Sequence, residues 1–324
     1  MLVADNIEKV FHSKLGPLHA IGGVSFSIKK GNTLGLVGES GCGKSTLGRV
    51  LIRLIEATSG SVLFDGVDLF SLSDSRMKEM RKKMQIVFQD PFSSLNPRLS
   101  VADLIAEPLI VNGICANSAE RTDRVFRLMD TVGLARRLYR SFPHELDGGR
   151  RQRIGIARAL ALEPEFIVLD EPVSALDVCI QAQILNLLGD LKRNSHYTYL
   201  FISHNMSVVR HVSDRIAVMY LGKIVEVADY DAIFTAPAHP YTKALLSAIP
   251  IPEPGAGRKR IVLEGDVPSP VNLPMGCGFS PRCFCRKDIC ERVSPVLTEF
   301  KPGHSAACHF AEGKEEKYPG GAGR

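Results

Sequence analysis

One glycine-rich stretch of the sequence has the composition of a phosphate-binding loop. It consists of Gly38, Glu39, Ser40, Gly41, Cys42, Gly43, Lys44, Ser45 and Thr46. The glycines let the backbone bend so that successive N–H groups point at phosphate oxygens. Lys44 can then reach the β- and γ-phosphates, and the Ser45 hydroxyl can bind Mg²⁺. The alternative is a glycine turn that only joins a strand to a helix, and it does not account for a lysine and a serine in register.

Two carboxylates at the end of an apolar segment form a second candidate group. Residues 166–169 are Phe, Ile, Val and Leu, and Asp170 and Glu171 follow them directly. Charged groups at the end of a buried strand are costly unless they meet a cation or a reacting group. We therefore expect Asp170 to bind Mg²⁺ and Glu171 to face an attacking water molecule.

Further polar groups stand where strands end or helices begin. Gln89 follows a short, mostly apolar segment, and His204 follows an expected strand over 198–202. A lone histidine usually has a packing or surface role, but at the end of a buried strand beside a phosphate loop it is a candidate for the phosphate site. One expected helix opens with two adjacent glycines, whose bare N–H groups suit an anion. This opening consists of Leu146, Asp147, Gly148, Gly149 and Arg150.

The elements that position these groups alternate between strand and helix. Apolar segments predict strands over 33–37, 85–88, 166–169 and 198–202, and a final hairpin over 216–227. This pattern indicates an α/β fold with a largely parallel sheet and a nucleotide at the carboxyl ends of its strands. Alternation over 24–28 predicts an antiparallel edge sheet near the N-terminus. Helical spacing without β-branched runs predicts a helical subdomain over about residues 92–160.

We expect a domain boundary near residue 235, because prolines become frequent beyond it and regular structure should be short. Residues 1–235 would form the main domain and residues 236–324 an appended C-terminal module. Five cysteines lie between residues 277 and 308 of this module. In a reducing compartment, metal ligation explains such a cluster better than disulfides do.

The spacing of these cysteines predicts an iron–sulfur cluster. Cys277, Cys283, Cys290 and Cys308 are separated by five, six and seventeen residues. Four thiolates are the usual ligand set of a [4Fe–4S] cluster, and a four-cysteine zinc site is the main rival. Cysteines that pack a small module without a ligand are the third alternative. Cys285 could replace Cys283 in the set.

The overall composition limits the class of protein. Hydrophobic residues make up 45% and charged residues 23% of the chain, which is ordinary for a globular protein with a sizeable core. The net charge of +5 is too small and too scattered to indicate nucleic-acid binding. No segment has the apolar length needed to span a bilayer, and the N-terminus lacks a signal-peptide core, so we expect a cytoplasmic protein.

Taken in order, these motifs resemble those of the ATP-binding-cassette (ABC) ATPases, P-loop proteins with a RecA-like core. The resemblance covers residues 1–235 and implies that residues 38–46 form the Walker A loop. Asp170 would close the Walker B motif, and Glu171 would be the general base. Gln89 would sense Mg²⁺ and the membrane partner, and His204 would contact the γ-phosphate.

The same resemblance implies that Phe11 stacks on adenine. From the residues alone, a packing role for this ring is an equal alternative. It also implies that two subunits enclose two ATP molecules. The segment 146–150 would then bind the γ-phosphate of ATP held by the opposite subunit. A loop crossing the interface would contain Ser174, Ala175, Leu176 and Asp177.

The segment 146–150 departs from the family pattern. The usual signature is Leu-Ser-Gly-Gly-Gln, whereas this chain has Asp147 in place of the serine and Arg150 in place of the glutamine. A carboxylate facing the partner's γ-phosphate predicts a weak, slowly hydrolysing site.

The C-terminal segment narrows the resemblance to the dipeptide/oligopeptide importer ATPases, and most closely to their F-type dipeptide subunit. The matching segments are 239–242, 265–270, 281–283, 303–304 and 307–309. Such ATPases act at the cytoplasmic face of the inner membrane with two membrane permeases, a periplasmic peptide-binding protein and a second ATPase, related or identical. Some carry a [4Fe–4S] cluster in this region.

Two other functions remain as alternatives. The same module could power an importer of nickel, glutathione or another solute, because the solute touches other subunits. A soluble ABC protein acting on DNA or the ribosome would need a long coiled coil or a second cassette, and this sequence has neither. We therefore expect no nucleic-acid partner.

Overall fold

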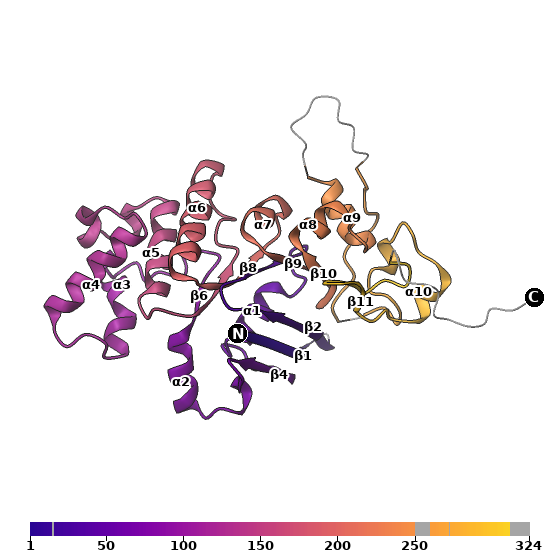
Figure 1. Ribbon diagram of the computed structural model, residues 1–324, viewed down its shortest axis with the longest axis horizontal. Coiled ribbons are helices and arrows are strands. Elements are labelled where there is room, and N and C mark those ends of the chain that lie inside the picture. The colour runs from indigo at the N-terminus through magenta and orange to yellow at the C-terminus, as the bar shows by residue number, and fades with distance from the viewer. Residues whose placement is uncertain (15, 250–259, 272, 312–324) are drawn as a thin grey trace, which may run out of the picture.

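An eight-stranded sheet carries the segments that end at the candidate site residues (Figure 1). The computed structural model describes residues 1–14, 16–249, 260–271 and 273–311. The strand order is β11-β12-β10-β9-β3-β8-β7-β6. The bounds are β3 Thr33–Val37, β6 Met84–Val87, β7 Phe166–Asp170, β8 Thr198–Ser203, β9 Arg215–Tyr220, β10 Lys223–Asp229, β11 Thr298–Lys301 and β12 His304–Ala306.

The middle of this sheet is parallel, as the alternating pattern predicts. Strands β6, β7, β8, β3 and β9 all run in one direction, so their carboxyl ends meet at the same edge. Every residue of β3, β7 and β8 is buried. Continuous burial is expected of parallel strands that are covered on both faces. The predicted α/β class and these three strands are therefore confirmed.

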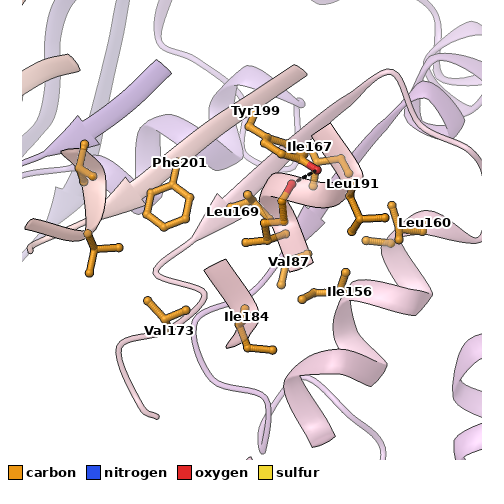
Figure 2. Packing of buried hydrophobic residues seen from close by; sticks show 14 of the residues in the cluster. Val87, Ile156, Leu160, Ile167, Leu169, Val173, Ile184, Leu191, Tyr199 and Phe201 are labelled. Atoms are coloured by element: carbon orange, nitrogen blue, oxygen red, sulfur yellow. Dashed lines mark hydrogen bonds between the residues drawn. The ribbon is translucent and has the colours of Figure 1, made fainter. Parts of the chain in front are cut away.

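Helices α5 (Gly148–Leu160) and α6 (Val178–Ser195) cover one face of the sheet. Figure 2 shows Leu169 of β7 and Phe201 of β8 among the aliphatic side chains of these helices, with Ile184 of α6 nearby. The Tyr199 hydroxyl donates a hydrogen bond to the Leu188 carbonyl at 3.4 Å, which ties β8 to α6. This packing fixes the strand ends from which the polar side chains project.

A second sheet is antiparallel and lies beneath helix α1 (Lys44–Leu51) in Figure 1. Its order is β2-β1-β4-β5, with β1 Leu2–Ser13, β2 Gly16–Ile28, β4 Ser59–Phe64 and β5 Val67–Asp68. Ile7 of β1, Leu36 of β3 and Leu47 of α1 belong to one buried cluster. The antiparallel sheet predicted near the N-terminus is thus present and packs on the phosphate-loop helix.

The segment between β6 and β7 is helical, in agreement with the expectation for residues 92–160. It contains α3 Val101–Val111, α4 Ser118–Thr131, η2 Arg136–Arg140, η3 Pro143–Glu145 and α5. Ser100 begins α3 with a capping box, because its side chain accepts from the Asp103 N–H and the Asp103 carboxylate accepts from the Ser100 N–H. These helices gather at one end of the molecule (Figure 1). The remaining helices before residue 236 are η1 Leu69–Ser71, α2 Asp74–Lys83, α7 Met206–Val212 and α8 Tyr230–Thr235.

Residues after 235 join the main sheet rather than forming a separate module. They contain α9 Pro240–Ser247, η4 Ser280–Arg282, α10 Asp288–Arg292, β11 and β12. Strand β12 pairs antiparallel with β10, and the Ala307 N–H donates to the Val225 carbonyl at 2.8 Å. The predicted Cys-rich C-terminal module is therefore not supported, because its strands extend the main sheet. The stretches 250–259 and 312–324 of that prediction lie outside the described residues.

Among the helices that the structure describes, none has the length and apolar character needed to cross a membrane.

Candidate functional site

The glycine-rich loop lies between β3 and α1, as the strand–loop–helix pattern predicts. Two of its glycines are required by space. A Cβ atom on Gly38 would come within 2.1 Å of the Met219 carbonyl oxygen, and one on Gly43 within 2.2 Å of the Ala20 carbonyl oxygen. Gly43 also has φ of 103°, which L side chains rarely adopt. The path of the loop backbone therefore requires glycine at positions 38 and 43.

Lys44 is buried inside this loop. Its ammonium group donates to the carbonyl oxygens of Gly38 at 2.8 Å and Glu39 at 2.9 Å. Only 4% of the residue is exposed, so its charge is held inside the loop. An anion entering the loop would meet this charge together with the positive end of α1.

Ser45 and Asp170 meet at the base of the loop. The Ser45 hydroxyl donates to Asp170 Oδ1 at 2.7 Å, and Arg49 lies 3.7 Å from Oδ2. Asp170 Oδ2 is buried and has no hydrogen bond from the described residues. Burial raises the pKa of the Asp170 carboxyl, although the hydrogen bond from Ser45 opposes this. A hydroxyl beside a buried, under-bonded carboxylate is a suitable oxygen donor set for Mg²⁺.

Glu171 is held by two of the other predicted residues. The Gln89 side-chain amide donates to Glu171 Oε2 at 3.0 Å, and His204 Nδ1 lies 3.1 Å from the same oxygen. Glu171 directly follows β7 and has φ of 46°, an uncommon backbone conformation. The segments that follow β6, β7 and β8 thus bring Gln89, Glu171 and His204 together.

Lys44, Gln89 and Glu171 line a pocket of about 230 Å³. Phe11, Gln89 and Glu171 line it together with residues 40–46. Phe11 is 37% exposed, and Lys9 Nζ lies 4.9 Å from the centroid of its ring, so a planar ligand can reach only part of the ring. Gly38, Glu39, Asp170 and His204 do not line the pocket, but each contacts a residue that does.

Sequence reasoning missed part of the pocket wall. Leu18, His19, Ala20, Leu221, Gly222 and Pro270 also line it. Gly222 has φ of 75°, and a Cβ there would lie 2.9 Å from the Ala20 carbonyl oxygen. Leu221 and Gly222 fall inside the hairpin predicted over 216–227, but nothing in their pattern indicates a ligand site. Pro270 comes from the C-terminal region, since its carbonyl accepts from the His19 N–H at 3.0 Å.

The segment 146–150 does not line this pocket and begins α5 instead. Asp147 Oδ1 accepts from the Arg150 N–H at 2.8 Å, so Asp147 is the N-cap of the helix. Arg150 Nε lies 3.5 Å from Asp147 Oδ2 and partly neutralises it. Gly149 must stay small, because a Cβ there would lie 2.5 Å from Ile180.

The loop 174–177 begins beside Glu171. The Ser174 hydroxyl donates to the Glu171 carbonyl at 3.1 Å. The Leu176 carbonyl accepts from the Gln181 side chain at 2.8 Å, and Asp177 caps α6 by accepting from the Ile180 N–H at 3.0 Å. Ala175 lies between these anchored positions. The loop is therefore fixed at both ends, directly after the carboxylate at the pocket.

The predicted iron–sulfur site is not supported. Cys277, Cys283, Cys285, Cys290 and Cys308 do line one pocket, of about 120 Å³. Within the described ranges, however, no group of three or more His, Cys, Asp or Glu side chains is placed to hold a metal ion. Burial raises the pKa of Cys277, and it raises the pKa of Cys283 to about 11. The arrangement fits neither the cluster nor the zinc alternative.

Two family models match the chain. Residues 21–174 match the ABC transporter model, and residues 225–290 match the model of the oligopeptide/dipeptide transporter C-terminal region. Among solved structures, the dimeric cassette MJ0796 in a post-hydrolysis state, bound to ADP and Pi, is similar with a TM-score of 0.66 and 30% identity. This match covers 71% of this chain and 99% of that one.

Curated relatives are similar over almost their whole length. The oligopeptide transport ATP-binding protein AppF of Bacillus subtilis is 52% identical over 93% of this chain and 92% of its own. A putative peptide import ATP-binding protein of Brucella ovis is 48% identical over 95% and 97%. The chain therefore belongs to the oligopeptide/dipeptide transporter family of ABC transporter ATP-binding proteins.

Proposed function

We propose that this chain binds ATP with Mg²⁺ and hydrolyses it to power the import of short peptides by an ABC transporter. The observation that carries the proposal is the position of Glu171, whose Oε2 meets Gln89 at 3.0 Å and His204 at 3.1 Å. Glu171 lines the same pocket as Lys44. The names of the relatives, which are oligopeptide transport and peptide import ATP-binding proteins, support the class of cargo.

The phosphate loop would bind the triphosphate through its N–H groups and Lys44. Lys44 would exchange its bonds to two loop carbonyls for stronger, charge-assisted bonds to phosphate oxygens. Ser45 and Asp170 would hold Mg²⁺, which neutralises charge on the β- and γ-phosphates when it is bound. Phe11 would stack on the adenine ring at the open side of the pocket.

Glu171 would orient the attacking water and accept its proton, in line with the γ-phosphate. Gln89 and His204 hold the carboxylate in one position, so little reorganisation is needed at the moment of reaction. Gln89 would also bind Mg²⁺, and His204 would turn to the γ-phosphate once the nucleotide is present. Most of the catalysis would come from positioning and from stabilising charge on the phosphoryl group.

A second ATPase subunit completes the proposal. Residues 146–150 do not line the pocket of their own chain, which supports their use on ATP held by a partner. The dimeric state of the similar cassette MJ0796 supports the same arrangement. The partner would be a related ATPase or a second copy. Both would sit with two membrane permeases at the cytoplasmic face of the inner membrane, and a peptide-binding protein would deliver cargo from the other side.

The cargo can be tested separately from the ATPase. The chain would be reconstituted in vesicles with its permeases and binding protein, and uptake of a labelled dipeptide would be compared with uptake of nickel and glutathione. We expect ATP-dependent uptake of the dipeptide. If the vesicles took up nickel or glutathione but not the dipeptide, the chain would instead power an importer of that solute.

The catalytic role is tested by Glu171→Gln, which keeps the size and hydrogen bonding of the side chain but removes the base. We expect unchanged ATP binding and turnover at no more than a few per cent of wild type in the assembled transporter. Glu165→Gln is the matched control, since Glu165 directly precedes the same strand at its opposite end and pairs with Lys30 and Lys83. If Glu171→Gln hydrolysed ATP over multiple turnovers at a rate near that of the control, Glu171 would not be the general base.

A further inference from the structure

The C-terminal region contacts the phosphate-binding loop at Glu39. Arg282 Nη1 lies 2.7 Å from Glu39 Oε2, and Nη2 lies 3.2 Å from Oε1, which makes a two-point ion pair. The Glu39 N–H donates to the Tyr241 hydroxyl at 2.8 Å. Both the main chain and the side chain of one loop residue are thus bound by residues more than 200 positions away in the sequence. Neither Arg282 nor Tyr241 lines the ATP pocket.

This contact is well sheltered from solvent. The Arg282 side chain is 9% exposed and that of Glu39 is 28% exposed, so water screens the pair less than an ordinary surface ion pair. The hydrogen bonds to Glu39 raise the pKa of Arg282 further above its ordinary range. Pairs of this planar, two-point geometry are among the stronger polar interactions in proteins.

Arg282 and Tyr241 are themselves fixed by an aromatic cluster. The Phe279 ring lies 5.2 Å from that of Tyr220 and 5.4 Å from that of Tyr241, and the two tyrosine rings are 4.7 Å apart. Phe279 is 1% exposed and Tyr241 is fully buried. The Arg282 N–H donates to the Phe279 carbonyl at 3.0 Å, which ties η4 to the same cluster. The side chains of Arg282 and Tyr241, which bind Glu39, are therefore held in fixed positions.

The charge of Glu39 makes the contact important for nucleotide binding. A carboxylate in a phosphate-binding loop repels the phosphates, and the repulsion between like charges grows as the surroundings become less polar. Arg282 neutralises that carboxylate. The Glu39 carbonyl also accepts from Lys44 at 2.9 Å, so a shift of Glu39 would move the lysine that faces the ligand.

We infer that Arg282 and Tyr241 are positioning residues for ATP binding, which hold Glu39 in place and cancel its charge. Nucleotide affinity of the cassette then depends on the C-terminal region, although that region does not touch the nucleotide through these side chains. This inference rests on the proposed ATP-binding function.

The test measures ATP affinity of the full-length chain with a fluorescent ATP analogue. Arg282→Met should weaken binding about tenfold, because it leaves Glu39 charged and unpaired. Adding Glu39→Gln should recover most of that loss, because the uncompensated charge is then gone. Tyr241→Phe should speed hydrogen exchange at the amide of Glu39, which loses its acceptor. Arg286→Met is the matched control, since Arg286 pairs with Glu291 in the same region at 3.5 Å and should leave affinity unchanged.

Each outcome is informative. Arg282→Met with the affinity of wild type would overturn the inference while leaving the proposed function intact. If Arg282→Met alone and Arg282→Met with Glu39→Gln bound ATP equally weakly, the charge argument would be overturned. A purely structural role of Arg282 predicts no recovery of affinity in the double variant. If Arg282→Met does not fold, the ATP affinity of the single variant Glu39→Gln is measured instead. A marked loss of affinity in Glu39→Gln would contradict the inference. Wild type that binds no ATP would instead refute the proposed function.

Discussion

Asp147→Ser is the substitution that most directly tests whether this chain completes a weak site in a partner. It restores the usual serine of the family signature at the start of α5. If residues 146–150 contact the partner's γ-phosphate, the carboxylate of Asp147 meets a like charge there. Arg150 lies 3.5 Å from the carboxylate and offsets part of the repulsion.

The structure indicates that the substitution costs little stability. Serine is about as good an N-cap as aspartate, so the hydrogen bond from the Arg150 N–H, now 2.8 Å, can be retained. The side chains of Arg150 and Asp147 are 47% and 57% exposed, and an ion pair this exposed contributes at most about 1 kcal/mol. Loss of a negative charge at the helix N-terminus costs about 0.3–1 kcal/mol.

The gain is expected in the closed dimer, whereas the cost falls on the folding stability of the single chain. Two unit charges about 4 Å apart repel by roughly 1 kcal/mol in water and about 4 kcal/mol at an intermediate effective dielectric. With Arg150 offsetting part of the repulsion, relief of about 1–2 kcal/mol corresponds to a gain of about 5- to 30-fold. We expect that gain in ATP-driven dimerisation, in ATPase rate, or in both.

The assay compares wild type, Asp147→Ser and Asp147→Ser with Arg150→Gln in the assembled transporter, with ATPase rate and dimer formation as readouts. Asp68→Ser is the matched control, because Asp68 caps η1 by accepting from the Phe70 N–H at 3.0 Å and lies in the antiparallel sheet. Urea unfolding of each variant checks the stability estimate. Unchanged rate and dimerisation after restoring the full signature would refute the repulsion argument.

Two further predictions follow from buried groups. Lys44→Ala should weaken ATP binding by about 10- to 100-fold in a binding titration, because charge-assisted hydrogen bonds contribute about 1.5–3 kcal/mol; affinity within about twofold of wild type would contradict the phosphate role. Burial lowers the pKa of His239 from its ordinary 6.5 to about 4, so below about pH 6.5 the unfolded chain binds a proton that the folded chain excludes. The free energy of unfolding should therefore fall by about 3 kcal/mol as the pH drops from 6.5 towards 4. In urea unfolding measured across this pH range, the fall should vanish in His239→Asn. It should persist in the control His144→Asn, because His144 is exposed.

The parallel core and the main site groups could be predicted because each rests on a local pattern. Strand β7 is five buried residues ending in Asp170, and the phosphate loop needs glycines at positions that the spacing already fixes. Once the strands are known to be parallel, their carboxyl ends must meet at one edge. The gathering of Gln89, Glu171 and His204 therefore follows from topology alone.

The C-terminal region could not be predicted in this way, because its order depends on contacts distant in sequence. Strand β12 has only three residues, too few for alternation to indicate a strand. The cysteine spacing matches a ligand set, but spacing does not fix the direction in which each side chain points. Arg282 lies in a short 3₁₀ turn, where nothing local indicates a partner in the phosphate loop.

Glu226 explains why the C-terminal region is part of the cassette fold. It lies in β10 with no exposed surface, and the two residues on either side of it, 224–225 and 227–228, are apolar. Its carboxylate accepts from the N–H groups of Ala238 at 2.7 Å and His239 at 2.9 Å, and lies 2.7 Å from His304 Nε2. Every one of these partners comes from beyond residue 235. A buried carboxylate without partners costs several kcal/mol, so removing the C-terminal region would leave β10 with an unsatisfied charge. Because β10 continues from β9, which pairs with the strand before the phosphate loop, the damage would extend to the ATP site.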